Sequence, residues 1–345
     1  MSNDSILLIG GAGHVGRWTA RSLRSVHPDV PLLIGGRDRA RAEQAAAELH
    51  AESVVIDDTA ADLGLGDRPL RAIATLFTDQ RLTALRLAQA RGVPHLSISP
   101  GIIELGPEVA AYMHRPQAAP VVLGTEWMVG GTTAPTLAFA KAFSRIDDIA
   151  IGALLDEQDA FGPAAEADLE RQTRTMPVAL ARQGGAYVWR AGDELATSFR
   201  AVDGTEMAAS TFSPNDVLGL ASATGAPNVR FSLAVGVSSS RRRGEPLSTE
   251  IIIELTGTDH AGGALRRRHA IVHPGGQMPL TGLGVALVLE RLLGVGGHPP
   301  TPAGLYFPYQ LIEPDMYFPR LAQAGGKVME LEAASPSPGG GGSLA

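Results

Sequence analysis

The first third of the chain alternates between short apolar runs and longer amphipathic segments. Runs suited to strands buried on both faces of a parallel sheet recur at residues 6–9, 31–34, 53–56, 72–77, 93–98 and 121–123. Segments with apolar positions at helical spacing lie between them, at residues 14–25, 35–49, 80–91 and 104–114. This alternation predicts an α/β domain with a doubly wound parallel sheet over residues 1–130.

After residue 130 the pattern changes. The sequence indicates a helix entering this region, a strand at 146–155, and a helix over 163–182 that is interrupted near Pro177. Further strand patterns follow at residues 186–190, 197–202, 229–237, 249–257 and 264–272. A strongly apolar helix is expected over 281–293. Residues 131–299 are therefore predicted to form an α+β substrate or dimerisation domain with a mostly antiparallel sheet, and residues 333–345 a flexible tail.

A glycine-rich turn follows the first apolar run. Gly11, Gly13 and Gly16 match G-x-G-x-x-G, with a predicted strand before them and a helix after them. In such a unit the first glycine makes the turn, the second admits a pyrophosphate, and the third packs helix on strand. The amides of His14 and Val15 at the helix start are predicted to hold phosphate. A glycine turn without a ligand is the alternative, because the chain contains 41 glycines.

The residues after the second strand indicate which dinucleotide binds. Enzymes that use NAD usually place Asp or Glu there to bond the ribose 2′-hydroxyl, whereas an arginine accommodates a 2′-phosphate. Here Gly35 and Gly36 precede Arg37, whose guanidinium suits phosphate. We predict that NADP(H) binds, with Gly36 and Arg37 in contact and Arg39 as a second cation or a surface charge. The alternative is that Arg37 is a solvated residue at a helix start.

Polar residues stand at the carboxyl ends of the later strands, where ligands bind in sheets of this kind. Asp57, Thr78 and Ser99 follow the third, fourth and fifth strands and are predicted cofactor contacts. Asp79 and Glu126 also lie at strand ends and are candidate acids or bases. Each of these residues has an alternative role in a turn or helix cap.

Histidines and arginines supply further candidates. His95 has a suitable intrinsic pKa of about 6.5 for acid–base catalysis, but its place in a strand also fits a structural role. The arginine run 241–243 suits a solvated hairpin loop, or alternatively a lid over an acidic substrate. The run 266–268 lies within a strand, so its side chains alternate between the two faces.

Composition narrows the classes of function. A length of 345 residues suits two domains, and a net charge of −7 disfavours a nucleic-acid partner. No apolar run reaches the roughly 20 residues of a membrane span, and the start lacks the pattern of a signal peptide, so a cytoplasmic location is expected. Because the chain has no cysteine, disulfides, thiol nucleophiles and thiolate metal sites are excluded.

Motifs of other enzyme classes are missing from the sequence. No tyrosine has a lysine four residues on, which disfavours a short-chain dehydrogenase, and no G-x-S-x-G marks a hydrolase. H-E-x-x-H is also missing, and His260, His269 and His273 lack the spacing of zinc ligands, so we predict no metal site.

The chain resembles the saccharopine dehydrogenase-like family of NAD(P)-dependent oxidoreductases. The segments that carry the resemblance are GGAGHVG, GGRD, GVPHLSISPG, LTGTDHAGG with MPLTGLGVALVLERLL, and AGLYFPYQLIEPDMYFPRLAQAGGKV. The sequence departs from the family's pattern at His95, Leu96 and Ser97, where many relatives carry tyrosine or aspartate. It departs again at Phe77, Thr78 and Asp79, where relatives often show Gly-Pro. The cofactor half therefore carries over better than the substrate half.

The resemblance, taken with Arg37, implies an NADP(H)-dependent oxidoreductase acting at a carbon–nitrogen or carbonyl centre of a small metabolite. It further implies a homodimer and a C-terminal segment, residues 300–332, that returns to complete the Rossmann domain. The substrate is left open, and a carboxylate-bearing metabolite is one alternative. A non-catalytic NADP-binding sensor or partner-binding protein with the same fold is another.

Overall fold

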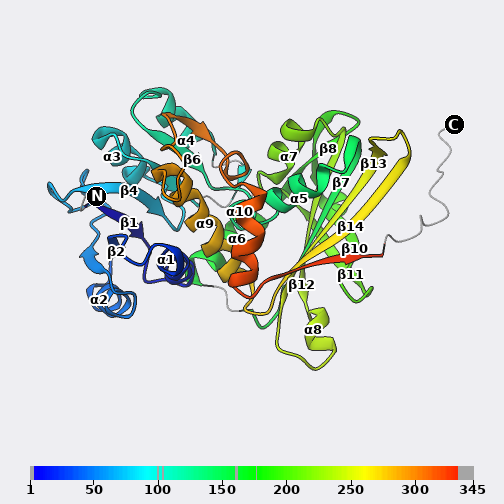
Figure 1. Cartoon of the computed structure of the whole chain (residues 1–345), viewed down its shortest axis with the longest axis horizontal. Coiled ribbons are helices and arrows are strands. Elements are labelled where there is room, and N and C mark those ends of the chain that lie inside the picture. The colour runs from blue at the N-terminus through cyan, green and yellow to red at the C-terminus, as the bar shows by residue number, and fades with distance from the viewer. Residues whose placement is uncertain (1–3, 99–100, 103–104, 160–161, 176, 333–345) are drawn as a thin grey trace.

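The computed structural model describes residues 4–98, 101–102, 105–159, 162–175 and 177–332. Its strands form two sheets that lie at opposite ends of the molecule. Between them lie helices α6 (Pro163–Thr175), α9 (Gln277–Leu293) and α10 (Pro314–Gln323) (Figure 1). The predicted tail, residues 333–345, lies outside the described residues, and so does Ser99.

The first sheet has seven parallel strands in the order β15-β6-β5-β4-β1-β2-β3. Its strands are β1 (Ser5–Ile9), β2 (Leu32–Gly36), β3 (Glu52–Val55), β4 (Leu70–Thr75), β5 (His95–Ser97), β6 (Pro120–Leu123) and β15 (Gly304–Tyr306). The strand order reverses at β1, which places a crevice at the carboxyl ends of β1 and β4.

Helices cover both faces of this sheet, because its strands are apolar on both sides. Leu8 packs with α1 (His14–Val26), α2 (Arg39–Glu48) and α9 (Gln277–Leu293), whereas Leu7 packs with α3 (Thr83–Arg91) on the other face. Helix α4 (Leu105–Met113) also belongs to this part of the chain. The predicted doubly wound arrangement is confirmed.

The second sheet has nine strands and is mixed. Seven of them follow the order β10-β11-β12-β7-β13-β14-β16, and β8 and β9 extend it from β12. The strands are β7 (Phe143–Asp156), β8 (Val178–Gln183), β9 (Ala186–Ala191), β10 (Ala196–Arg200), β11 (Glu206–Phe212), β12 (Asn228–Gly236), β13 (Thr249–Asp259), β14 (Ala264–His273) and β16 (Lys327–Leu331). All pairs are antiparallel except β12 with β7. The mostly antiparallel sheet is therefore confirmed.

One prediction of local structure in this half is wrong. The helix expected over 163–182 ends as α6 at Thr175, and residues after Pro177 form strand β8 instead. Proline cannot continue a helix that precedes it, and the apolar residues beyond it pair with β9. The sequence also left β11 and α7 (Asp216–Thr224) unassigned, although both approach the end of β6.

Helix α9 forms the centre of the molecule and lies beside α1 (Figure 1). It is buried along nearly its whole length, which explains its all-round apolar sequence. A Cβ at Gly282 would lie 2.5 Å from Trp18 Cβ, and one at Gly284 would lie 2.3 Å from the Val129 carbonyl oxygen. These two glycines let α9 approach its neighbours more closely than any other residue would allow.

The remaining helices border the second sheet. They are α5 (Thr133–Ala140), α6 (Pro163–Thr175), the short α8 (Ser239–Arg242) and α10 (Pro314–Gln323), with 3-10 turns at Gly192–Leu195 and Pro308–Gln310. Among the described residues, no helix combines the length and apolar character needed to cross a membrane.

Candidate active site

The predicted glycine turn joins β1 to α1. Gly10 has a φ of +85°, which glycine adopts at little cost, and it makes the sharp bend. A Cβ at Gly16 would lie 2.4 Å from Gly11 Cα, and one at Gly11 would lie 2.8 Å from the Leu8 carbonyl oxygen. Strand and helix therefore meet with no room for side chains at these two positions.

The N-terminus of α1 is open to a ligand. The N–H of Gly13 donates to the Gly10 carbonyl at 2.9 Å, and Gly13 is the N-cap without a capping side chain. Among the described residues, none accepts from the N–H groups of His14, Val15 and Gly16. These donors and the positive end of the helix dipole favour an anion.

A cleft of about 940 Å³ begins at this helix and runs between the two sheets. It is lined by the turn after β1, the ends of β2, β4 and β6, α6, the ends of β7 and β11, β12, and the first turn of α9. The predicted site residues that line the cleft are Gly13, His14, Val15, Gly16, Gly36, Arg37, Thr78, Asp79 and Glu126. Gly11, Asp57 and His95 are not among the residues lining it.

One end of the cleft, beyond β2, carries two cations. Arg37 and Arg41 both line it and are exposed, and among the described residues neither has an ion-pair partner. Asp38 between them caps α2 by accepting from the Arg41 N–H at 3.1 Å. Arg39 points away from the cleft and pairs with Glu43 at 3.7 Å. The second cation that lines the cleft is Arg41, four residues after Arg37, whereas Arg39 is not among the lining residues.

Asp57 shapes a turn beside this end. Its carboxylate accepts from the Thr59 hydroxyl at 2.6 Å and the Thr59 N–H at 2.9 Å, and these bonds lower its pKa. Asp58, the next residue, lines the cleft instead.

Thr78 and Asp79 lie at the end of β4 in different settings. The Thr78 hydroxyl donates to Asp168 at 3.1 Å and accepts from Arg171 at 3.2 Å, which links β4 to α6 across the cleft. Asp79 accepts from the N–H groups of Arg81 at 3.1 Å and Ala84 at 3.0 Å, so it caps the start of α3.

His95 lies inside the first sheet. Its side chain is 2% exposed, and its Nε2 lies 3.3 Å from the Thr75 hydroxyl. Burial lowers the pKa of His95 to about 3, so the ring is neutral at physiological pH. A strand position between two neighbouring strands, β4 and β6, explains this burial.

Glu126 follows β6 and lies in a buried polar corner. Its side chain is 2% exposed, and its Oε2 accepts from the Thr133 hydroxyl at 2.6 Å and the Tyr309 N–H at 3.1 Å. Asp216, at the start of α7, accepts from the Trp127 N–H at 2.7 Å and from the Thr132 hydroxyl. Burial raises the pKa of Glu126 well above its usual range, and the nearby Asp216 raises it further.

The part of the cleft between Glu126 and the second sheet is apolar. Its surface comes from Trp127, Met128, Leu155, Phe212, Leu233 and Met278. The rings of Trp127 and Phe212 meet edge to face with centroids 5.3 Å apart, which holds both in place.

The arginine runs lie elsewhere. Arg241 pairs with Asp156 at 2.7 Å, Arg242 with Asp203 at 2.7 Å, and Arg268 with Glu254 at 2.9 Å. None of the six arginines in the two runs is among the cleft's lining residues. Within the described residues, no group of three or more His, Asp or Glu side chains is placed to hold a metal ion.

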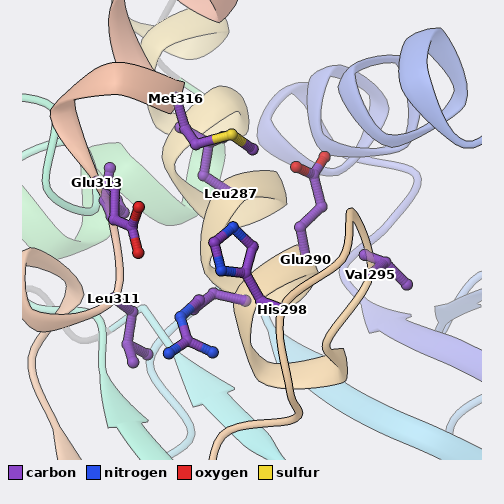
Figure 2. A pocket seen from close by; sticks show the side chains of 9 residues that line it. Leu287, Glu290, Val295, His298, Leu311, Glu313 and Met316 are labelled. Carbon is purple, nitrogen blue, oxygen red and sulfur yellow. The ribbon is translucent and has the colours of Figure 1, made fainter.

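A second hollow lies at the far end of α9. Figure 2 shows His298 between Glu313 and Glu290, with Leu287, Leu311 and Met316 around it. Its volume of about 20 Å³ is that of a water-sized space, so it cannot hold a dinucleotide.

Comparison with known proteins bears on the fold. Neither a protein-family model nor a curated protein sequence matches the chain. Among solved structures, the apo saccharopine dehydrogenase (L-Glu forming) of Saccharomyces cerevisiae superposes with a TM-score of 0.59 and 13% sequence identity. The match covers 95% of this chain and 100% of the yeast protein. The chain shares the fold of saccharopine dehydrogenase.

Two further solved structures match this chain with lower TM-scores. A myo-inositol dehydrogenase from Corynebacterium glutamicum matches with a TM-score of 0.46 and 15% identity, over 96% of this chain and 99% of that one. GenD2 from gentamicin A biosynthesis, solved in complex with NAD, matches with a TM-score of 0.48 and 13% sequence identity. That match covers 96% of this chain and 97% of GenD2.

Several residues of the cleft were not singled out from the sequence. Arg41 stands four residues after Arg37 in the sequence. On the helix predicted over residues 35–49, this spacing would place the two side chains on one face, which is the signal that could have identified Arg41. Asp168, Arg171 and the apolar residues of the second sheet carry no comparable signal, because only the packing of the two halves brings them to the cleft.

Proposed function

We propose that the protein is an NADP(H)-dependent oxidoreductase whose cofactor lies along the cleft between the two sheets. The observation that carries the proposal is the order of groups along this one cleft. The pair Arg37 and Arg41 stands at the β2 end, the open N–H groups of α1 in the middle, and an apolar chamber beyond β4 and β6. A 2′-phosphate, a pyrophosphate and a nicotinamide need these three surroundings in this order.

The cofactor supplies the redox chemistry when bound. It would supply a hydride, with its two electrons, to the carbon of a C=N or C=O group, and a proton from water or an acidic side chain would complete the amine or alcohol. Of the three predicted acid–base residues, Glu126 borders the apolar chamber. Asp79 caps a helix and His95 lies away from the cleft, so the proposal assigns neither a catalytic role.

The proposed domains are residues 1–130 with 300–332 for the cofactor and 131–299 for the substrate. The pairing of β15 with β6 supports the return of the late segment, which Figure 1 shows beside β6. In contrast, β16 within the same segment pairs with β14 in the second sheet.

Substitution of Arg37 tests the cofactor. We expect Arg37→Glu to weaken NADPH binding at least about tenfold, or 1.4 kcal/mol, because a carboxylate then faces the 2′-phosphate. NADH lacks that phosphate, so its dissociation constant should stay within about twofold. Both constants are measured by titration calorimetry at low and high salt, and the NADPH effect should shrink at high salt.

Arg39→Glu is the matched control, since it makes the same charge change two residues away on a side chain that does not line the cleft. It should alter neither constant. Equal binding of NADH and NADPH to the wild-type protein, or an unchanged NADPH constant in Arg37→Glu, would reject the proposal for NADP(H). Binding of NADPH without its consumption by any imine or carbonyl compound would favour a sensor instead.

A further inference from the structure

The apolar chamber is built from both halves of the protein. Trp127 and Met128 follow β6, Leu155 and Leu233 come from β7 and β12, and Phe212 ends β11. A third aromatic ring, Phe231, backs this wall with its centroid 5.7 Å from that of Trp127. These side chains are fixed by packing before any ligand binds, so the chamber is preformed.

The arginines of the cleft are either exposed or already paired with a carboxylate of the protein. The arginines that line the cleft within the described residues are Arg37, Arg41, Arg81 and Arg171. The first two stand at the β2 end, and Arg81 lies exposed beyond β4. Arg171 is held by Asp168 at 2.9 Å and by the Thr78 hydroxyl. A carboxylate buried without a cation costs several kcal/mol, so the chamber rejects one.

A few polar atoms border the apolar wall. The atoms are Trp127 Nε1, Thr125 Oγ1, Glu126 Oε1 and Gln277 Nε2, which are buried and have no hydrogen-bond partner among the described residues. Buried polar groups without partners are costly and are commonly satisfied by a ligand. A surface that is mainly apolar and carries only these polar atoms suits a compound that is mainly apolar and carries one small polar group.

From these observations we infer that the substrate is a neutral, mainly apolar imine or carbonyl compound without carboxylates. This inference rests on the proposed function and narrows it. It departs from the carboxylate-bearing metabolite that the family resemblance leaves open. The C=N or C=O group is the one polar group of such a compound, and the apolar remainder lies against Trp127, Phe212 and Leu233.

Binding is tested first, with protein saturated with NADP⁺ and the neutral fluorescent amine N-phenyl-1-naphthylamine as probe. We expect saturable binding that small apolar ketones displace. Leu233→Arg should weaken it at least about tenfold, because it replaces buried apolar surface by a charge. Val235→Arg is the matched control on the same strand, since Val235 is 53% exposed and does not line the cleft, whereas Leu233 is 9% exposed.

Selectivity is tested with two cyclic imines that differ in one substituent, 2-methyl-1-pyrroline and 1-pyrroline-2-carboxylate. Competition with the probe should favour the methyl compound at least about tenfold, and any NADPH consumption should follow the same order. In Leu233→Arg this preference should fall or reverse, because the new guanidinium can pair with the carboxylate.

Three results would overturn the inference: no saturable probe binding, equal effects of Leu233→Arg and Val235→Arg, or preference for the carboxylate in the wild-type protein. Each leaves the cofactor proposal intact if Arg37→Glu still weakens NADPH selectively. A protein that binds neither dinucleotide would reject the proposed function itself.

Discussion

Two carboxyl groups share the buried corner behind Trp127. Asp216 is 0% exposed, and burial raises its pKa to about 7, although hydrogen bonds from Thr132 and the Trp127 N–H oppose the shift. Glu126 nearby has its pKa raised for the same reason and by the charge of Asp216. The corner therefore holds at least one proton at neutral pH.

This proton makes stability depend on pH. The ordinary pKa of Asp216 is 3.8, so between about pH 4 and about pH 7 the folded protein binds a proton that the unfolded chain has lost. The proton's contribution to stability is complete below pH 3.8, the ordinary pKa of an aspartate. It is lost as the pH rises through the folded-state pKa of about 7. We expect the free energy of unfolding of wild type minus that of Asp216→Asn to fall by about 1.4 kcal/mol per pH unit between about pH 5 and about pH 7.

Urea unfolding of both proteins across this range measures the difference. The amide cannot ionise, so any constant cost of the substitution cancels from the slope. A difference that does not change with pH would show that Asp216 is already ionised in the folded protein.

Gly16 is a second residue whose role follows from distance. Gly16→Ala would place a methyl 2.4 Å from Gly11 Cα and 2.5 Å from its carbonyl oxygen, so α1 must move away from the turn. We expect a loss of about 1–3 kcal/mol in the free energy of unfolding and weaker binding of both dinucleotides. Gly36→Ala is the control for stability, since its nearest neighbour, Ala42 Cβ, would lie 3.8 Å away. Equal stability of the two variants would contradict this account.

At the residue scale, the sequence predicts well what is local. The spacing of Gly11, Gly13 and Gly16 defines the turn because strand, turn and helix are consecutive. The choice between Arg39 and Arg41 depends on which face of α2 meets the cleft, and His95 owes its burial to strands β4 and β6 on either side. Neither was readable from the residues alone.

Among the elements, α10 is joined to α9 and α1 by one buried ion pair. Arg320 donates two hydrogen bonds of 2.9 Å to Glu290 on α9 and two more of 2.9 Å to the carbonyl and hydroxyl oxygens of Ser22 on α1. Both partners are nearly inaccessible to solvent. The pair therefore holds three helices together at the centre of the molecule.

Removal of one partner tests this joint. We expect Arg320→Leu to destabilise the protein by about 3–5 kcal/mol, because it leaves Glu290 buried with only His27 Nε2, 3.8 Å away, as a basic neighbour. Arg145→Ala, which breaks the exposed pair with Asp147, should cost less than about 1 kcal/mol. Thermal and urea unfolding measure the loss of stability in each variant. Similar losses in the two variants would show that the contacts of Arg320 do not hold the three helices together.

Element prediction succeeded where a segment is long and periodic. The apolar patterns predict the buried strands of the first sheet and helix α9. At β8 they predict a helix instead, because the apolar residues on both sides of Pro177 fit the helical period as well as the strand period. The parallel pairing of β7 with β12 spans some 80 residues of sequence and leaves no local signal.

On the scale of the whole molecule, the last part of the chain binds both sheets. Strand β15 extends the first sheet, and β16 extends the second. The fold class follows from the sequence, but the apolar chamber does not, since it exists only where β7, β11 and β12 face the end of β6. The homodimer and the cytoplasmic location stay predictions.

The position of β15 has a consequence for how the protein is made. Strand β6 is complete once residue 123 is synthesised, but its neighbour β15 lies at residues 304–306. The nascent chain therefore carries an unpaired parallel strand edge while some 180 further residues leave the ribosome. Such an edge can pair with other chains. The first sheet therefore cannot close until residues 304–306 have been synthesised, after most of the second sheet.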